Sequence, residues 1–296
     1  MVYELSDWQQ RARQQAFIEQ AIIGGRRVAA QSGATFAAIN PATGQVLAQV
    51  AACGEAEVEL AVRSARQAFE AGVWSQSTPS ERKQVLLRLA ELILAHRDEL
   101  ALLDSLNMGK PVMDAWNIDV PGAAGVFRWY AESLDKLYDE VAPSARNVLA
   151  TITREALGVV AAVVPWNFPL DMAAWKLAPA LAAGNSVVLK PAEQSPFSAL
   201  RLAELALQAG LPEGVLNVVP GLGESAGKAL GLHMDVDCLA FTGSTEVGKY
   251  FMGYSAQSNL KQVWLECGGK SANLVFADCQ DLDLAAEKAA FGIFFN

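Results

Sequence analysis

The sequence has few cysteines, few charged side chains and no long apolar run. Only four of the 296 residues are cysteines, and their spacing matches neither a metal site nor a disulfide framework. We therefore expect no metal and a reducing, cytoplasmic compartment. The longest apolar stretch, 156–165, is about half of the ~20 residues that a membrane-spanning helix needs, so no membrane partner is expected.

Basic side chains are also scarce. The 23 Lys and Arg residues are outnumbered by 32 Asp and Glu residues, which gives a formal net charge of −9 and argues against a nucleic-acid or anionic-membrane partner. The first ten residues contain no basic segment followed by an apolar one, so no signal peptide is expected. In contrast, 52% of the residues are hydrophobic, which excludes a disordered protein. The length suggests two domains, or one large α/β domain with additions.

The first half of the chain is predicted to be mainly helical. Apolar residues recur at three- and four-residue spacing over 55–71 and 80–105. A third helix is expected over about 115–136, with Pro121 and Gly122 disturbing its start. Residues 141–155 begin like a turn and then alternate, which predicts an exposed two-stranded excursion. Since an exposed strand edge is a liability unless it is covered, a partner subunit is expected there.

Strands and helices alternate from residue 158 onward. Continuous apolar strands are predicted at 158–164, 186–190, 215–219, 238–241 and 262–266, with helices at 170–183, 197–209, 224–232 and 245–255. Strands that are apolar throughout indicate a sheet covered on both faces. The pattern predicts an α/β fold with a doubly wound parallel sheet, which binds ligands at the carboxyl ends of its strands.

Polar candidates follow the first two of these strands. Asn167 lies in a loop bracketed by Pro165 and Pro169. A rigid loop could present its amide as a preorganised donor to an oxyanion, although the amide could equally tie its own turn. Lys190 and Glu193 follow the second strand, where they could hold a ribose by its hydroxyls and disfavour a 2′-phosphate. The alternative is a solvated surface pair.

Glycines characterise the next two loops. Gly223 lies in a glycine-containing loop that matches only part of the dinucleotide-binding fingerprint. After the fourth strand, Gly243 and Ser244 lead into a helix whose backbone N–H groups could bind a pyrophosphate. Ser244 fits an ordinary helix N-cap equally well.

Glu266 ends the fifth strand, and two glycines soon after it allow the backbone to approach a ligand closely. Partial burial would raise the pKa of Glu266 toward that of a general base, whereas the alternative is an ion pair with Lys270. Neighbours along a strand point to opposite faces. Cys267 is therefore predicted to be a core thiol directed away from Glu266, and not a nucleophile.

Taken in order, these segments resemble the aldehyde dehydrogenase superfamily over essentially the whole chain. The most specific are Pro165-Trp166-Asn167-Phe168-Pro169, Lys190-Pro191-Ala192-Glu193, Phe241-Thr242-Gly243-Ser244-Thr245 and Leu265-Glu266-Cys267-Gly268-Gly269-Lys270-Ser271. The resemblance implies NAD as the cofactor, a small-molecule aldehyde as the substrate, and oxidation of that aldehyde to the acid.

The resemblance also implies roles for individual positions. Asn167 would be the oxyanion-stabilising amide, and Glu266 the general base that activates water. The NAD site would be lined by Val164, Trp166, Lys190, Glu193, Gly223, Gly243, Ser244 and Val247. The implied domains are an NAD-binding domain at 1–137 and 157–268, an oligomerisation hairpin at 138–156 and the start of a second, catalytic α/β domain at 269–296. A homo-oligomer is expected for the full-length form.

The chain departs from the superfamily's pattern at its end. The family reaches a nucleophilic cysteine a few residues after the segment that resembles 292–296, and this chain stops first. The chain alone is therefore expected to be inactive, and a non-catalytic NAD-binding or subunit-interaction protein is the alternative. No cysteine present is a convincing substitute: Cys53 lies in the helical first half, far in sequence from every sheet loop, Cys238 starts a buried strand, and Cys279 follows a further strand.

Residues 119–124 and 263–266 resemble the bacterial γ-glutamyl-γ-aminobutyraldehyde dehydrogenases of polyamine breakdown. Gly122 falls where relatives often place a bulky residue of the substrate tunnel. The missing side chain would widen the route for a long, polar aldehyde.

Overall fold

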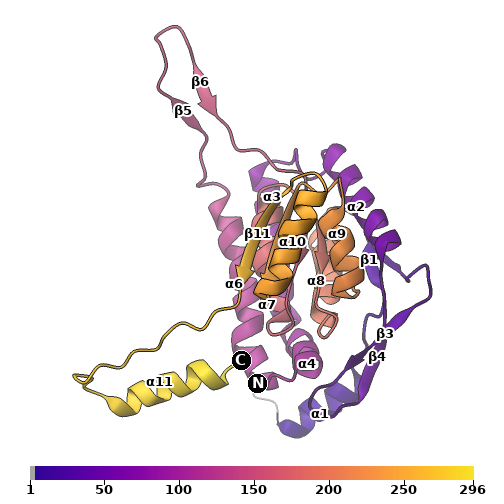
Figure 1. Ribbon diagram of the computed structural model, residues 1–296, viewed down its shortest axis with the longest axis vertical. Coiled ribbons are helices and arrows are strands. Elements are labelled where there is room, and N and C mark those ends of the chain that lie inside the picture. The colour runs from indigo at the N-terminus through magenta and orange to yellow at the C-terminus, as the bar shows by residue number, and fades with distance from the viewer. Residues whose placement is uncertain (1–3) are drawn as a thin grey trace.

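A seven-stranded sheet lies at the centre of the computed structural model, which describes residues 4–296 (Figure 1). Its order is β11-β10-β7-β8-β9-β1-β2. Five strands pair in parallel: β7 (Val159–Val163), β8 (Ser186–Lys190), β9 (Leu216–Val218), β10 (Cys238–Gly243) and β11 (Gln262–Cys267). The predicted α/β fold is therefore confirmed. Residues 1–3, with which the predicted first domain begins, lie outside the described residues.

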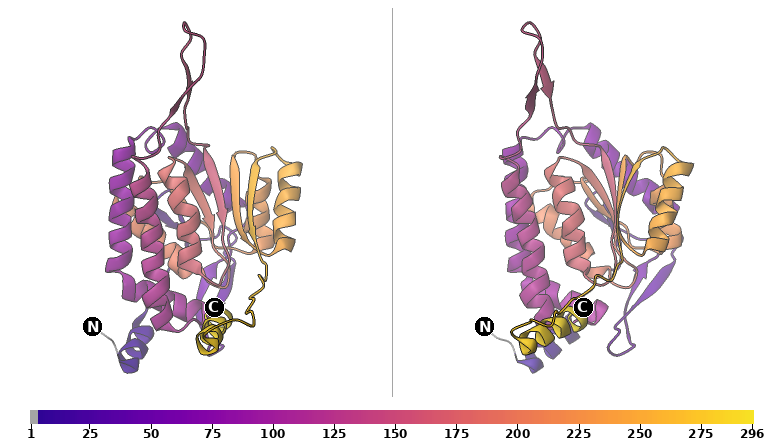
Figure 2. Two further views of the ribbon diagram at one scale, coloured as in Figure 1. Left: turned by 90° about the vertical axis from the view of Figure 1, so that its left-hand side faces the viewer. Right: turned by 60° about the vertical axis from the view of Figure 1, so that its left-hand side comes forward.

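Helices cover both faces of the sheet (Figure 2). One face packs on α3 (Pro79–Ala95), α6 (Val120–Ser133), α7 (Pro169–Ala182) and α8 (Phe197–Ala209). The other packs on α2 (Glu55–Glu70), α9 (Lys228–Leu232) and α10 (Thr245–Gln257). Every residue of β7 and β8 is buried, and alternate residues enter opposite cores: Val160 joins the first and Ala161 the second. This double burial explains why these strands are apolar throughout.

The prediction of a mainly helical first half was wrong for residues 21–51, which form four strands. β1 (Ala21–Ile23) pairs antiparallel with β9, and β2 (Arg26–Val28) extends the sheet, so the sheet is mixed rather than purely parallel. β3 (Thr35–Ile39) and β4 (Val46–Ala51) form a separate hairpin. β1 has only three residues, all buried, and so has no alternation that local patterning could detect.

The single helix expected over 80–105 is two helices. The first, α3, ends before His96, whose backbone (φ −99°, ψ 24°) leaves the helical region, and α4 (Arg97–Met108) follows. The apolar spacing continues across the break because both helices bury residues in the same core.

The expected disturbance before the third helix is present. The short α5 (Val112–Asp114) is followed by a π-helical turn, η1 (Ala115–Asp119), which leads into α6. A second π-helical turn, η2 (Gly223–Gly227), opens the helix expected at 224–232. An additional helix, α1 (Leu5–Gln14), lies near the amino terminus.

Two segments lie outside the layered body. β5 (Glu140–Ala142) and β6 (Ala150–Ile152) form a hairpin that projects away from it, as Figure 1 shows. After β11 the chain is irregular until α11 (Leu282–Phe294), so the strand expected before Cys279 is absent from the described residues. In the described chain this segment has no neighbouring strand with which to pair. Across residues 4–296, no helix is both long and apolar enough to span a membrane.

Candidate functional site

The predicted site residues gather where the parallel strands end. From β7 the chain continues to β8 and β9 on one side and later to β10 and β11 on the other, so the strand order reverses beside β7. Ligands of open α/β sheets bind in the crevice at such a reversal. Val164 follows β7 and donates its N–H to the Lys190 carbonyl oxygen at 3.2 Å, while Gly243 and Glu266 lie at the ends of β10 and β11.

Asn167 occupies the loop between β7 and α7 and is half-buried. The loop is held on one side by Ser195, whose hydroxyl donates to the Trp166 carbonyl oxygen at 3.2 Å. Within residues 4–296 the Asn167 amide makes no hydrogen bond, so the alternative that it ties its own turn is wrong. The amide is thus available to donate to a ligand.

Lys190 and Glu193 form an ion pair of 2.8 Å between Nζ and Oε2. The Lys190 side chain is only 4% exposed and that of Glu193 32% exposed, so the alternative of a solvated surface pair is also wrong. Burial lowers the pKa of Lys190, and the Glu193 carboxylate opposes this shift. The buried ammonium fixes the direction of the carboxylate beside the strand ends.

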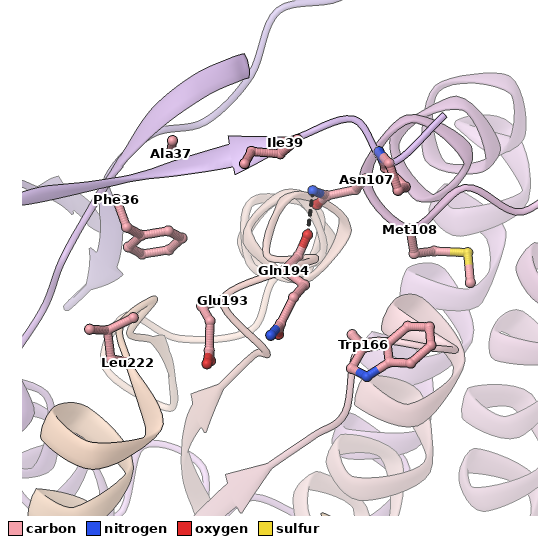
Figure 3. Close-up of a pocket in the computed structure, with 10 residues that line it drawn as sticks. Phe36, Ala37, Ile39, Asn107, Met108, Trp166, Glu193, Gln194 and Leu222 are labelled. Carbon is pink, nitrogen blue, oxygen red and sulfur yellow. Dashed lines mark hydrogen bonds between the residues drawn. The ribbon is translucent and has the colours of Figure 1, made fainter. Parts of the chain in front are cut away.

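Glu193 lines a cavity of about 410 Å³ (Figure 3). Trp166 and Leu222 contribute further walls from the loops that follow β7 and β9. Phe36 and Ile39 of β3 complete the cavity, and sequence reasoning missed this contribution. The available signal was a short run of β-branched and aromatic residues between Gly33 and Pro41.

The loop after β9 is packed against the start of α2. A Cβ atom at Gly221 would lie 2.5 Å from the Cys53 carbonyl oxygen, so a larger residue does not fit, whereas Gly223 faces open space. The Cys53 N–H donates to the Pro220 carbonyl oxygen at 3.1 Å. Cys53, although far in sequence, thus touches this sheet loop. Burial raises the pKa of its thiol to about 12, which makes it a poor nucleophile.

Ser244 is the N-cap of α10. Its hydroxyl oxygen accepts a hydrogen bond from the Val247 N–H at 3.2 Å, which confirms the capping role. A helix start has four N–H groups without helical partners, and the hydroxyl satisfies only one of them. The others leave this end of the helix electropositive.

Glu266 and Cys267 point to opposite faces of β11, as predicted. Cys267 faces α10, where a Cβ atom at Gly248 would lie 3.1 Å from its sulfur. The Glu266 carboxylate instead lies near Lys176 of α7, and its negative charge opposes the lowering of the Lys176 pKa by burial. Glu266 is exposed, so the expected burial of its carboxylate is absent from this chain. Among residues 4–296 it forms no ion pair with Lys270, and Cys267 is half-buried rather than fully buried.

Lys176 was missed by sequence reasoning. Burial lowers its pKa, and the Glu266 carboxylate opposes the shift. Its position within a helix offered no motif that could have singled it out. The described residues also contain no group of three or more His, Cys, Asp or Glu side chains placed to hold a metal ion.

Comparison with known proteins gives a consistent result. The model of the aldehyde dehydrogenase family matches residues 28–296. The NADP/NAD-dependent aldehyde dehydrogenase PuuC of Escherichia coli (strain K12) is 53% identical over 294 residues, which cover 99% of this chain and 59% of PuuC.

Solved structures agree with this match. The γ-glutamyl-γ-aminobutyraldehyde dehydrogenase from Burkholderia cenocepacia J2315 is 57% identical with a TM-score of 0.97, covering 99% of this chain and 59% of that one. A mutant of the P. syringae indole-3-acetaldehyde dehydrogenase AldA, in complex with NAD+ and IAA, is 53% identical with the same TM-score and the same coverage of both chains. The chain therefore spans about three-fifths of the length of these relatives.

Proposed function

The chain belongs to the aldehyde dehydrogenase family, and from this premise we propose that it forms the NAD-binding part of an enzyme that oxidises an aldehyde to the carboxylic acid. The observation that carries the proposal is that three groups lie at the same end of the parallel strands. They are the Asn167 amide, which makes no hydrogen bond within residues 4–296, the Glu266 carboxylate and the first turn of α10. Acyl-transfer chemistry requires a nucleophile, an oxyanion donor and a base, and these residues supply the last two.

The proposed cofactor site follows the strand ends. Lys190 and Glu193 suit ribose hydroxyls, the start of α10 at Ser244 suits a pyrophosphate, and Trp166 lines the adjoining cavity. Val164, Gly223, Gly243 and Val247 would complete it. The donor set fits NAD, which when bound accepts the hydride from the substrate.

In the proposed reaction, a nucleophile of the whole enzyme adds to the aldehyde carbonyl and later carries the acyl group that water releases as the acid. The Asn167 amide donates a hydrogen bond to the carbonyl oxygen as negative charge develops there. Glu266 takes a proton from the water molecule that releases the acid. The Glu266 carboxylate favours the charged form of Lys176, because its negative charge opposes the lowering of the Lys176 pKa by burial.

We expect the chain to bind NAD at least ~10-fold more tightly than NADP, because the Glu193 carboxylate suits ribose hydroxyls and repels a 2′-phosphate. Isothermal titration calorimetry with each cofactor gives the two dissociation constants and hence their ratio. Glu193→Gln should narrow the ratio, whereas Glu213→Gln, at an exposed glutamate outside the site, should not. Equal or tighter binding of NADP by the unaltered chain would remove Glu193 from this role.

The proposed substrate is a long, polar aldehyde such as an aminoaldehyde. A cavity of about 430 Å³ is lined by Gly122, Gly125, Val126, Trp129, Tyr130 and Trp175. Two of these residues lack a side chain, which leaves room for a substrate longer than acetaldehyde. The γ-glutamyl-γ-aminobutyraldehyde named for the B. cenocepacia relative is of this kind.

Replacing Gly122 with Met should lower kcat/KM for an aminoaldehyde about 10- to 100-fold more than for acetaldehyde, because it narrows the cavity. A Cβ atom at Gly122 would lie 3.2 Å from Oδ1 of Asp171, so Gly122→Ala is the control for this contact alone. Gly125 has no atom within 4 Å of such a Cβ, and Gly125→Met should show the same selectivity. Equal losses for both substrates would assign the position a structural role.

We further propose that the β5–β6 hairpin joins copies of the enzyme into a homo-oligomer. The proposed NAD-binding domain is interrupted by this hairpin at 138–156, and a second domain begins at residue 269. The hairpin exposes Val141, Leu149 and Ile152. Val141→Lys combined with Ile152→Lys should shift the enzyme that contains this chain to smaller species in analytical ultracentrifugation. Leu5→Lys, at an exposed leucine of α1, is the control. An unchanged mass would refute the assignment.

All four cysteines are free, which fits our proposal of a cytoplasmic location.

A further inference from the structure

A buried cluster of charged side chains lies beneath the Asn167 loop. Lys110, just after α4, pairs with Asp119 at the end of η1, with 2.7 Å between Nζ and Oδ2. Both side chains are 1% exposed, and the second oxygen of Asp119 has no hydrogen-bond partner in the described chain. A buried ion pair is weak evidence for stability, because removing two charges from water offsets much of their attraction. The pair therefore calls for another explanation.

Both Lys110 and α4 contact the residues that follow Asn167. The Lys110 ammonium lies 3.7 Å from the centre of the Phe168 ring, which is a cation–π contact. The Leu170 N–H donates to Oδ2 of the buried Asp104 in α4 at 3.4 Å. With Ser195 holding Trp166 on the other side, the loop is anchored before and after Asn167.

We propose that the Lys110–Asp119 pair positions the Asn167 amide by holding the neighbouring Phe168 ring. An oxyanion donor is effective only when its direction is set before the reaction, and a displacement of about 1 Å can cost ~10²-fold in rate. The Asp119 carboxylate prevents the flexible Lys110 side chain from leaving the ring. The inference rests on the function proposed above for Asn167.

The test replaces the pair with apolar residues in the enzyme that contains this chain. Lys110→Met combined with Asp119→Leu removes both charges and keeps similar volume, a change that often leaves stability unaltered. With acetaldehyde, we expect kcat to fall about 10- to 100-fold, while KM and the thermal midpoint change little. Should this variant not fold, Lys110→Gln with Asp119→Asn keeps a polar pair without the cation, and the same fall in kcat is expected.

A double-mutant cycle separates positioning from a general structural effect. In an Asn167→Ala background, the pair has no amide left to position, so removing it should lower kcat no further. An independent, multiplicative loss in that background would overturn the proposal. So would an unchanged kcat when the pair is removed from the enzyme with Asn167 intact.

The matched control is a second cation–π contact, made by a residue of α4. The Arg97 guanidinium of α4 lies 3.4 Å from the centre of the Trp116 ring, and within residues 4–296 the hydrogen bonds of these two side chains go to the Trp116 carbonyl oxygen and Asp98, not to the Asn167 loop. Arg97→Met should therefore leave kcat unchanged. If Asn167→Ala itself leaves kcat unchanged, the proposed role of Asn167 fails; if Asn167→Ala lowers kcat and the pair variants do not, only the positioning inference fails.

Discussion

Replacing Glu266 with Gln in the enzyme that contains this chain is expected to slow steady-state turnover by about 10²- to 10⁴-fold. A glutamine cannot take the proton from the water molecule that releases the acid. The steps before water attack do not need this base, so the first turnover should still produce NADH at a normal rate. Rapid-mixing measurement of NADH should show a full initial burst and then a very slow phase.

Replacing Glu266 with Gln should change the reaction without disturbing the fold, because of the position of its side chain. Its side chain is exposed at the end of the edge strand β11 and forms no ion pair with residues 4–296, so the fold should lose little. Glu70→Gln, at an exposed residue ending α2, tests for a nonspecific effect of removing a carboxylate. Unchanged turnover, in an enzyme where acid release limits the rate, would eliminate Glu266 as the base.

Asn167→Ala should lower the rate of hydride transfer by about 10²- to 10³-fold, the usual cost of losing one oxyanion donor. The amide makes no hydrogen bond to residues 4–296, so the change removes a donor without leaving a protein group unpaired. Single-turnover NADH formation measures the effect. The dissociation constant for NAD should be unaltered, since Asn167 is not assigned to the cofactor site.

The two variants should differ in which phase of the reaction they slow. Asn167→Ala slows the burst itself, whereas Glu266→Gln preserves the burst and slows the steady-state phase. A loss of less than about 5-fold in the burst rate of Asn167→Ala would contradict its role as an oxyanion donor, for which a larger effect is usual.

Features that depend on interactions between residues close in the chain are predictable from the amino-acid sequence. The continuous apolar runs of β7 and β8 showed a sheet buried on both faces, because each residue there enters one of two cores. The sequence also predicts Ser244 as an N-cap, because the cap hydrogen bond joins its hydroxyl to the N–H of Val247, only three residues later. The opposite directions of Glu266 and Cys267 followed from the two-residue period of a strand.

Features that depend on contacts between distant segments are visible only in the folded chain. Pairing of Ile22 with Val218 makes β1 part of the sheet, and a three-residue strand carries no pattern that reveals this. The approach of Phe36 to Glu193 across the cavity, of Lys176 to Glu266, and of Lys110 to Phe168 likewise depends on how helices and strands pack. Local periodicity reports which face of an element is buried, but the residue that it meets is set by the path of the whole chain.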